Sequence, residues 1–138
     1  MVRQIYMLDT NTASYIIKGI PSAVREHLLA VPMESVCIST ITEAELLCGV
    51  EKKSENKRLR QIVVEFILRV DVLPWNSSVA KSYAKLRVTC EKEGKPLGAM
   101  DMLIAAHSVA IQATLVTNDK AFYNVKHLLE LQDWTIKH

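Results

Sequence analysis

Four acidic side chains stand where a carboxylate could take part in chemistry, namely Asp9, Glu45, Asp101 and Asp119. Asp9 directly follows a short apolar run, residues 5–8, which is typical of a strand buried on both faces. Ligands of open parallel sheets bind just outside the carboxyl ends of the strands, so an acid at this position is available to a ligand. The alternative is that Asp9 only turns the chain or caps a helix through Asn11 and Thr12, because Asp and Asn both satisfy free backbone N–H groups.

Asp119 repeats this arrangement near the other end of the chain. It follows the apolar run 113–116 and precedes a short helical stretch at residues 120–123. Thr117, the first residue after the apolar run, is expected either to donate a hydroxyl hydrogen bond within the site or to stabilise the turn. Helix capping is the alternative role for Asp119 as well.

Two glutamates lie close together in the segment 39–45, and helical geometry separates their roles. Thr40 as N-cap, with Glu43 three residues later, predicts a capping box, which gives Glu43 a structural role. Glu45 lies four residues after Ile41 and three before Cys48, so it shares a helix face with these apolar residues. A lone acid on such a face needs a reason, because burying an unpaired carboxylate is costly.

Asp101 stands at the start of one of the most apolar helices expected in the chain, about residues 99–111. An acid in the first turn interacts favourably with the helix dipole by roughly 0.3–1 kcal/mol, which is a sufficient structural role for an exposed helix. A helix that is apolar nearly all round is expected to be buried, however. Burial makes service to the dipole a weaker explanation for Asp101.

If the four acids converge, they need cations or protons. Two carboxylates about 4 Å apart repel by roughly 4 kcal/mol at an effective dielectric constant of 20. Hard oxygen donors without a matching His or Cys set favour Mg²⁺ or Mn²⁺ over zinc, and His107 is interpreted as a packed core residue. We expect Asp9 and Asp101 to bind the metal directly, while Glu45 and Asp119 orient water, act as a base or hold a second ion.

The elements that must position these acids alternate along the chain. Short apolar or β-branched runs predict strands, and apolar residues at three- and four-residue spacing predict helices. The expected strands are 5–8, 36–38, 70–73 and 113–116, and the expected helices are about 21–30, 41–52, 55–68, 77–93 and 99–111. This alternation favours an α/β layered domain with a buried, mainly parallel sheet.

Composition limits the class of protein further. The chain has 138 residues, of which 49% are hydrophobic, and this predicts one globular domain over residues 1–138. The most apolar stretch, 102–116, is shorter than the roughly 20 residues that span a bilayer, and the N-terminus does not resemble an export signal. Three widely spaced cysteines fit a reducing cytoplasm.

Charge by itself does not predict a nucleic-acid partner. The net charge is only +2, whereas sequence-independent affinity needs several clustered Lys and Arg residues. The mixed run 51–60 has five basic and two acidic residues, and it is interpreted as a solvated helix surface rather than as an RNA-binding patch.

Read together, four motifs resemble the acidic motifs of VapC-like PIN domains and span almost the whole chain. Any one of them is weak evidence, but their order and separations are specific. They are Met7-Leu-Asp-Thr-Asn11, Ser39-x-Ile-Thr-x-x-Glu-Leu-x-x-Gly49, Gly98-Ala-Met-Asp-Met-Leu-Ile-Ala-Ala-His107 and Val116-Thr-Asn-Asp119, followed by Asp133-Trp134. By this matching the active-site acids of the family fall on Asp9, Glu45, Asp101 and Asp119.

The resemblance implies a PIN-like three-layer α/β/α domain with a central, mainly parallel sheet of four or five strands. It further implies a Mg²⁺-dependent endoribonuclease, the toxin of a type II toxin–antitoxin pair, with tRNA as the expected substrate and the initiator tRNA anticodon loop as the expected target. A homodimer and a larger complex with a VapB-like antitoxin are expected, with operator DNA contacted only through the antitoxin.

Two other classes are compatible with parts of the sequence. The segment Asp9-Thr-Asn-Thr12 resembles the first motif of aspartyl-phosphate phosphatases, but Asn11 stands where that motif has a second Asp. A non-catalytic module that binds an antitoxin through an acidic pocket is the second alternative. Such a module should tolerate Asp101→Asn, whereas an enzyme should not.

Overall fold

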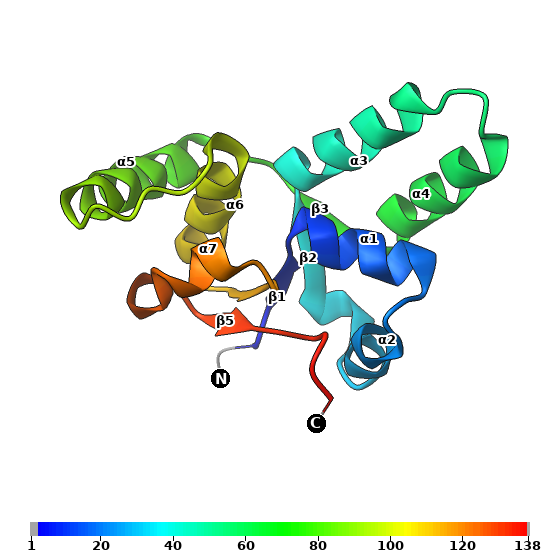
Figure 1. The fold of residues 1–138 in the computed structure, drawn as a ribbon, viewed down its shortest axis with the longest axis horizontal. Helices are drawn as coiled ribbons and strands as arrows, with labels where there is room; N and C mark the ends of the chain where they lie inside the picture. Colours follow the sequence, from blue (N-terminus) through cyan, green and yellow to red (C-terminus); the bar gives the residue numbers. More distant parts are fainter. Residues whose placement is uncertain (1–2, 138) are drawn as a thin grey trace.

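A parallel sheet of five strands forms the centre of the molecule, which the computed structural model describes over residues 3–137 (Figure 1). The strands lie in the order β3-β2-β1-β4-β5, and every neighbouring pair is parallel. The chain therefore starts in the middle of the sheet, builds one side, and crosses back to build the other. The strands are β1 (Tyr6–Leu8), β2 (Val36–Ser39), β3 (Asp71–Leu73), β4 (Thr114–Val116) and β5 (Leu131–Gln132).

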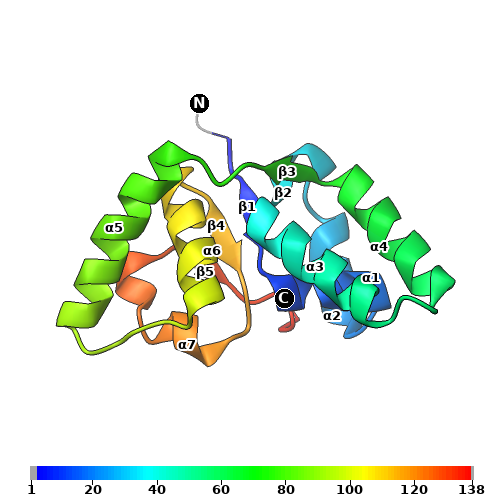
Figure 2. The ribbon, with the colours of Figure 1, turned by 90° about the horizontal axis from the view of Figure 1, so that it is seen from above.

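Helices cover both faces of the sheet. In Figures 1 and 2, α1 to α4 lie on one side of the strands, and α5, α6 and α7 lie on the other. This arrangement confirms the predicted three-layer α/β/α class. The helices are α1 (Thr10–Lys18), α2 (Ser22–Leu29), α3 (Thr40–Lys52), α4 (Lys57–Arg69), α5 (Ser77–Lys92), α6 (Ala99–Ala110) and α7 (Lys120–Tyr123), with 3₁₀ turns at Met33–Ser35 and Lys126–Leu128.

The strands divide their side chains between two cores. Met7 and Leu115 pack with α5, α6 and α7, whereas Leu8 and Val116 pack with residues of α1 to α4. Successive side chains of a strand point to opposite faces, so a strand covered on both faces is apolar at every position. This explains why the short runs in the sequence show no polar alternation.

The predicted elements are present, and the structure adds two more. α1 was expected only as the helix that Asp9 would cap, and its bounds were not predicted, because its first residues, Thr10-Asn-Thr-Ala-Ser14, are mostly polar and poor helix formers. β5 is only two residues long, and so short a strand gives no periodic signal. The parallel pairing of β5 with β4 makes the sheet five-stranded.

The predicted N-cap of α3 is wrong by one residue. Ser39, not Thr40, is the N-cap, and its Oγ accepts a hydrogen bond from the backbone N–H of Ile41 at 3.1 Å. Thr40 is the first residue of the helix, and its Oγ1 accepts a hydrogen bond from the N–H of Trp75 at 3.2 Å. The Thr40 hydroxyl, which the capping-box pattern predicted to cap the helix, is therefore used in a tertiary contact instead.

The apolar helix α6 forms part of the core, as its composition predicted. Its buried residues include His107, which is 1% exposed and whose Nδ1 lies 2.8 Å from Ser39 Oγ. Burial lowers the pKa of His107, so the imidazole is neutral and structural at neutral pH, in agreement with its predicted role. Within residues 3–137, no helix is both long enough and apolar enough to cross a membrane.

Candidate active site

The sheet brings two of the predicted acids to one place, the carboxyl ends of β1 and β4. Asp9 follows the last residue of β1, and Thr117 and Asp119 follow the last residue of β4. β1 and β4 are neighbours in the sheet, and the strand order reverses between them. A crevice at such a reversal is where open α/β sheets bind their ligands.

Asp9 is both a helix cap and a member of the site, so the two interpretations are compatible. It is 4% exposed, and its Oδ1 accepts a hydrogen bond from the N–H of Thr12 at 2.8 Å, which caps α1. Burial raises the pKa of Asp9 above its ordinary value, while hydrogen bonds from Thr117 and Thr12 act in the opposite direction. A buried carboxylate in this state gains from a cation.

Thr117 connects the two strand ends. It is completely buried, its side chain hydrogen-bonds to Asp9, and its Oγ1 accepts the N–H of Asp119 at 3.0 Å. Asp119 in turn caps α7, with Oδ1 accepting the N–H of Ala121 at 2.9 Å. Thr117 therefore forms the turn and also contacts the site, which are the two roles expected of it.

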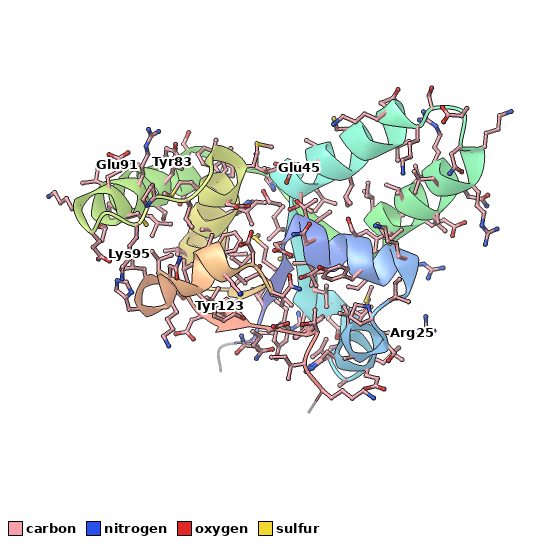
Figure 3. All side chains as sticks on the ribbon, in the orientation of Figure 1. Arg25, Glu45, Tyr83, Glu91, Lys95 and Tyr123 are labelled. Atoms are coloured by element: carbon pink, nitrogen blue, oxygen red, sulfur yellow. The ribbon has the colours of Figure 1, made fainter. Side chains whose placement is uncertain are left out.

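Glu45 approaches the site from α3 (Figure 3). Its Oε1 accepts a hydrogen bond of 2.5 Å from the hydroxyl of Thr10, the residue directly after Asp9. The predicted face was only partly correct, since Cys48 is exposed and the buried positions of α3 are Thr42, Leu46 and Val50. Sequence reasoning missed Thr10, although a hydroxyl next to Asp9 was a visible signal.

The pKa of Asp101 is affected by all three of the other predicted acids. It is partly buried in the first turn of α6, and burial is the largest cause that raises its pKa. Charge repulsion from Asp119, Asp9 and Glu45 raises the pKa of Asp101 further, in that order. Four carboxylates, two at strand ends and two in helices, therefore lie close enough for the charges of three of them to act on Asp101.

The donor set fits a hard divalent cation that binds few protein ligands directly. Among residues 3–137, no three carboxylate, imidazole or thiol groups form a ready-made metal cage. A closed zinc site needs four such ligands, whereas Mg²⁺ keeps several waters and takes one or two carboxylates. The convergence of acids on Asp101 supplies the negative charge that such an ion would neutralise.

In the absence of metal, Asp101→Asn is expected to stabilise the fold. The pKa of Asp101 is raised, so the folded state binds this proton more tightly than the unfolded state does, and stability is lost as the pH rises through the folded pKa. The Asn side chain does not ionise, so the variant does not lose this stability as the pH rises. Because Asp101 is partly exposed and solvent screens the repulsion, we expect a gain of about 3 °C in melting temperature at pH 7 in EDTA.

This gain should shrink as the pH falls through the raised pKa of Asp101, and it should disappear below the ordinary carboxyl value of 3.8, where Asp101 is protonated in both the folded and the unfolded state. The matched control is Glu55→Gln, which removes an exposed acid from the turn between α3 and α4. An equal gain in both variants, or a lower melting temperature of Asp101→Asn at pH 7, would contradict the proposed repulsion.

The PIN domain family matches residues 6–128, and this is the class that the fold and the cluster of acids define. The chain is 32% identical to the tRNA(fMet)-specific endonuclease VapC of Shigella flexneri, over 94% of this chain and 98% of the relative. It is 35% identical to ribonuclease VapC2 of Rickettsia felis, over 94% and 98%. The solved DNA-bound VapBC of Salmonella typhimurium has a TM-score of 0.87 at 32% identity and covers 96% of this chain and 99% of its own.

These similarities extend over nearly the full length of the chains compared. The chain therefore belongs to the VapC ribonucleases of the PIN domain family. Membership confirms the family that the four sequence motifs resembled.

Proposed function

We propose that this chain is the toxin of a type II toxin–antitoxin pair and a metal-dependent endoribonuclease that hydrolyses RNA phosphodiester bonds. The observation that carries the proposal is the convergence of Asp9, Glu45 and Asp119 on Asp101 at the carboxyl edge of a parallel sheet. Phosphodiester hydrolysis needs positive charge near the phosphate, and this site is built to attract a cation. Residues 1–138 act as a single PIN domain in this proposal.

Asp9 and Asp101 are proposed to hold Mg²⁺, for which Mn²⁺ can substitute. Such an ion neutralises charge on the phosphate oxygens and acidifies a bound water. Glu45 and Asp119, the other two acids that act on Asp101, are proposed to orient the attacking water or accept its proton. Thr10 and Thr117 are positioning residues, because their hydroxyls hold the carboxylates of Glu45 and Asp9.

The proposed substrate is tRNA, with the anticodon loop of initiator tRNA as its target. The Shigella flexneri relative is named a tRNA(fMet)-specific endonuclease, and it is 32% identical to this chain. An acidic metal site contacts phosphate and is indifferent to sequence, so the choice of RNA depends on surrounding surfaces that bind unpaired bases.

A VapB-like antitoxin is the proposed partner in the cytoplasm, and operator DNA is contacted only through it. The Salmonella typhimurium relative was solved as a DNA-bound VapBC. This chain has an apolar groove of about 580 Å³ between α1, α2 and α4, where Leu29 is 72% exposed. An apolar surface of this kind marks a protein-binding site, and the antitoxin is its proposed occupant. We also propose that the chain forms a homodimer within a larger complex.

Metal-dependent cleavage tests the proposal. Purified protein without antitoxin is incubated with total bacterial RNA in Mg²⁺, and the new RNA ends are mapped. We expect discrete ends that disappear with EDTA, return with added Mg²⁺ or Mn²⁺, and are suppressed by the cognate antitoxin. A folded protein that produces no discrete ends would contradict the proposal and favour the non-catalytic antitoxin-binding module.

A further inference from the structure

A second, smaller cavity opens directly beside the acidic site, between α1, α3 and α4. Its volume is about 200 Å³. This is below the roughly 300–1,000 Å³ of pockets for drug-sized ligands, so the cavity suits one small planar or sugar-like group. Two residues already placed at the site, Thr10 and Glu45, form one end of the cavity.

Two of the three helices that border this cavity, α1 and α3, contribute its polar and charged side chains. α1 contributes Thr10, Ser14 and Lys18, α3 contributes Glu45 and Gly49, and Lys53 follows directly after α3 as its C-cap. The four-residue spacing places Thr10, Ser14 and Lys18 on one face of α1, and Glu45 and Gly49 on one face of α3. Eight residues of helix span about 12 Å, so Lys18 lies about 12 Å along α1 from Thr10. Lys53 lies just beyond the last turn of α3, past Gly49 as seen from Glu45.

The hydrogen bond between Thr10 and Glu45 joins the two helices at one end, and from there they diverge (Figure 1). Aliphatic side chains from α1, α3 and α4 line the space between the two diverging helices. The cavity therefore has a carboxylate at its inner end, lysines at its outer end and an apolar wall, which consists of Ile17, Leu46, Val50, Leu59 and Val63.

Gly49 is unusual because the fold does not require it. It lies inside α3, its backbone is helical, and an added Cβ would have no neighbouring atom within 4 Å. Gly is among the least favourable residues in a helix interior, so its presence weakens α3 without relieving any clash. A residue without a side chain at the wall of the cavity leaves room for a ligand.

Lys18 and Lys53 are exposed, and neither forms an ion pair within the described part of the chain, residues 3–137. Both are therefore available to a ligand anion. The sequence placed Lys53 in a solvated charged run, but the structure places it at the rim of the cavity. An apolar wall and two cations suit a ligand with a flat ring and an anionic group. A nucleotide of the RNA strand has both, and it is covalently connected to the phosphate that is cleaved.

We propose that this cavity binds one nucleotide of the RNA substrate next to the scissile phosphate, an inference that rests on the proposed function. The base or ribose of that nucleotide lies over Gly49 against the apolar wall. Its phosphate pairs with Lys18 and Lys53. An antitoxin segment is a less suitable occupant, because the volume of the cavity is too small for a helix and because Lys18 and Lys53 place two positive charges at its rim.

Filling the cavity tests the proposal. Gly49→Leu adds a side chain at a residue that lines the cavity, and the matched control Cys48→Leu adds the same side chain at the neighbouring exposed position, which does not line it. With a synthetic RNA that spans the mapped cleavage site, Gly49→Leu should raise KM about tenfold and change kcat less than about twofold. Cys48→Leu should leave both unchanged. The melting temperature of Gly49→Leu should rise by about 3 °C, because Leu is the better helix former, so misfolding cannot imitate the effect.

Removing charge at the rim tests the phosphate contact separately. In the double variant Lys18→Gln, Lys53→Gln, the slope of log affinity against log salt concentration should fall by about 1.4, or 0.7 for each lost contact with single-stranded RNA. Lys52→Gln is the matched control, since Lys52 is adjacent to Lys53 but does not line the cavity. An unchanged slope in the double variant would overturn the phosphate assignment.

The outcomes separate the nucleotide site from the enzyme. Cleavage by the unmutated protein with equal KM in Gly49→Leu and Cys48→Leu would overturn the nucleotide site and leave the ribonuclease intact. An unchanged KM together with weaker inhibition by the antitoxin would overturn the RNA assignment in favour of an antitoxin contact. No cleavage by the folded unmutated protein would overturn both proposals.

Discussion

Asp101→Asn is expected to lower the rate of RNA cleavage by at least about 10³-fold while the protein stays folded. The substitution keeps the shape of the side chain but removes the charge on which the other three acids act. A bound divalent ion contributes several kcal/mol to stabilising phosphoryl transition states, and about 4 kcal/mol corresponds to 10³-fold in rate. The initial rate of cleavage under saturating Mg²⁺ measures the loss, and the increase in metal-free melting temperature confirms the fold.

A neighbouring acid provides the control for this variant. Glu43 lies two residues before Glu45 in the first turn of α3, but only Glu45 is hydrogen-bonded to Thr10 and acts on the pKa of Asp101. Glu43→Gln should therefore cleave within about threefold of the unmutated rate, while Glu45→Gln should be severely impaired. Full activity of Asp101→Asn, or equal losses in the two glutamate variants, would show that the site has been assigned to the wrong acids.

Trp134→Ala is expected to destabilise the fold by about 3–5 kcal/mol, the usual cost of removing a large aromatic side chain from a core. Trp134 is 2% exposed although it lies near the C-terminal end of the chain. Its ring packs at 5.6 Å from that of Tyr6 and stacks on His27 at 5.8 Å, and its Nε1 donates to Gln132 Oε1 at 3.0 Å. It belongs to the same core as Leu8, the residue before Asp9.

Urea denaturation followed by circular dichroism measures this loss. Ile136→Ala is the control, because Ile136 is 63% exposed and its truncation should change the free energy of unfolding by less than about 0.5 kcal/mol. A loss below about 1 kcal/mol in Trp134→Ala would mean that the last residues are dispensable for the core. The resulting instability should also reduce cleavage at 37 °C. Leu8 belongs to the same core as Trp134, and it directly precedes Asp9 of the candidate active site.

Much of the architecture could be predicted because its signals are local. Apolar strands without alternation and amphipathic helices follow from the periodicity of nearby residues, and α3 to α6 lie within two residues of their predicted bounds. The bounds of α1 were not predicted because its first residues are polar and weakly helical, and β5 was missed because it is too short. The N-cap of α3 was misplaced because Trp75, 35 residues away, engages Thr40.

The sequence by itself determined which four acids are candidates, because strand ends and helical phase are properties of neighbouring residues. Their catalytic and metal-binding roles remain predictions. Only the tertiary structure decided that these acids act on one another, that Thr10 holds Glu45, and that Gly49 and Lys53 border a cavity. Thr10 and Glu45 are 35 residues apart, and their contact depends on the order of strands in the sheet. Local periodicity contains no information on that order, so long-range geometry had to come from the fold.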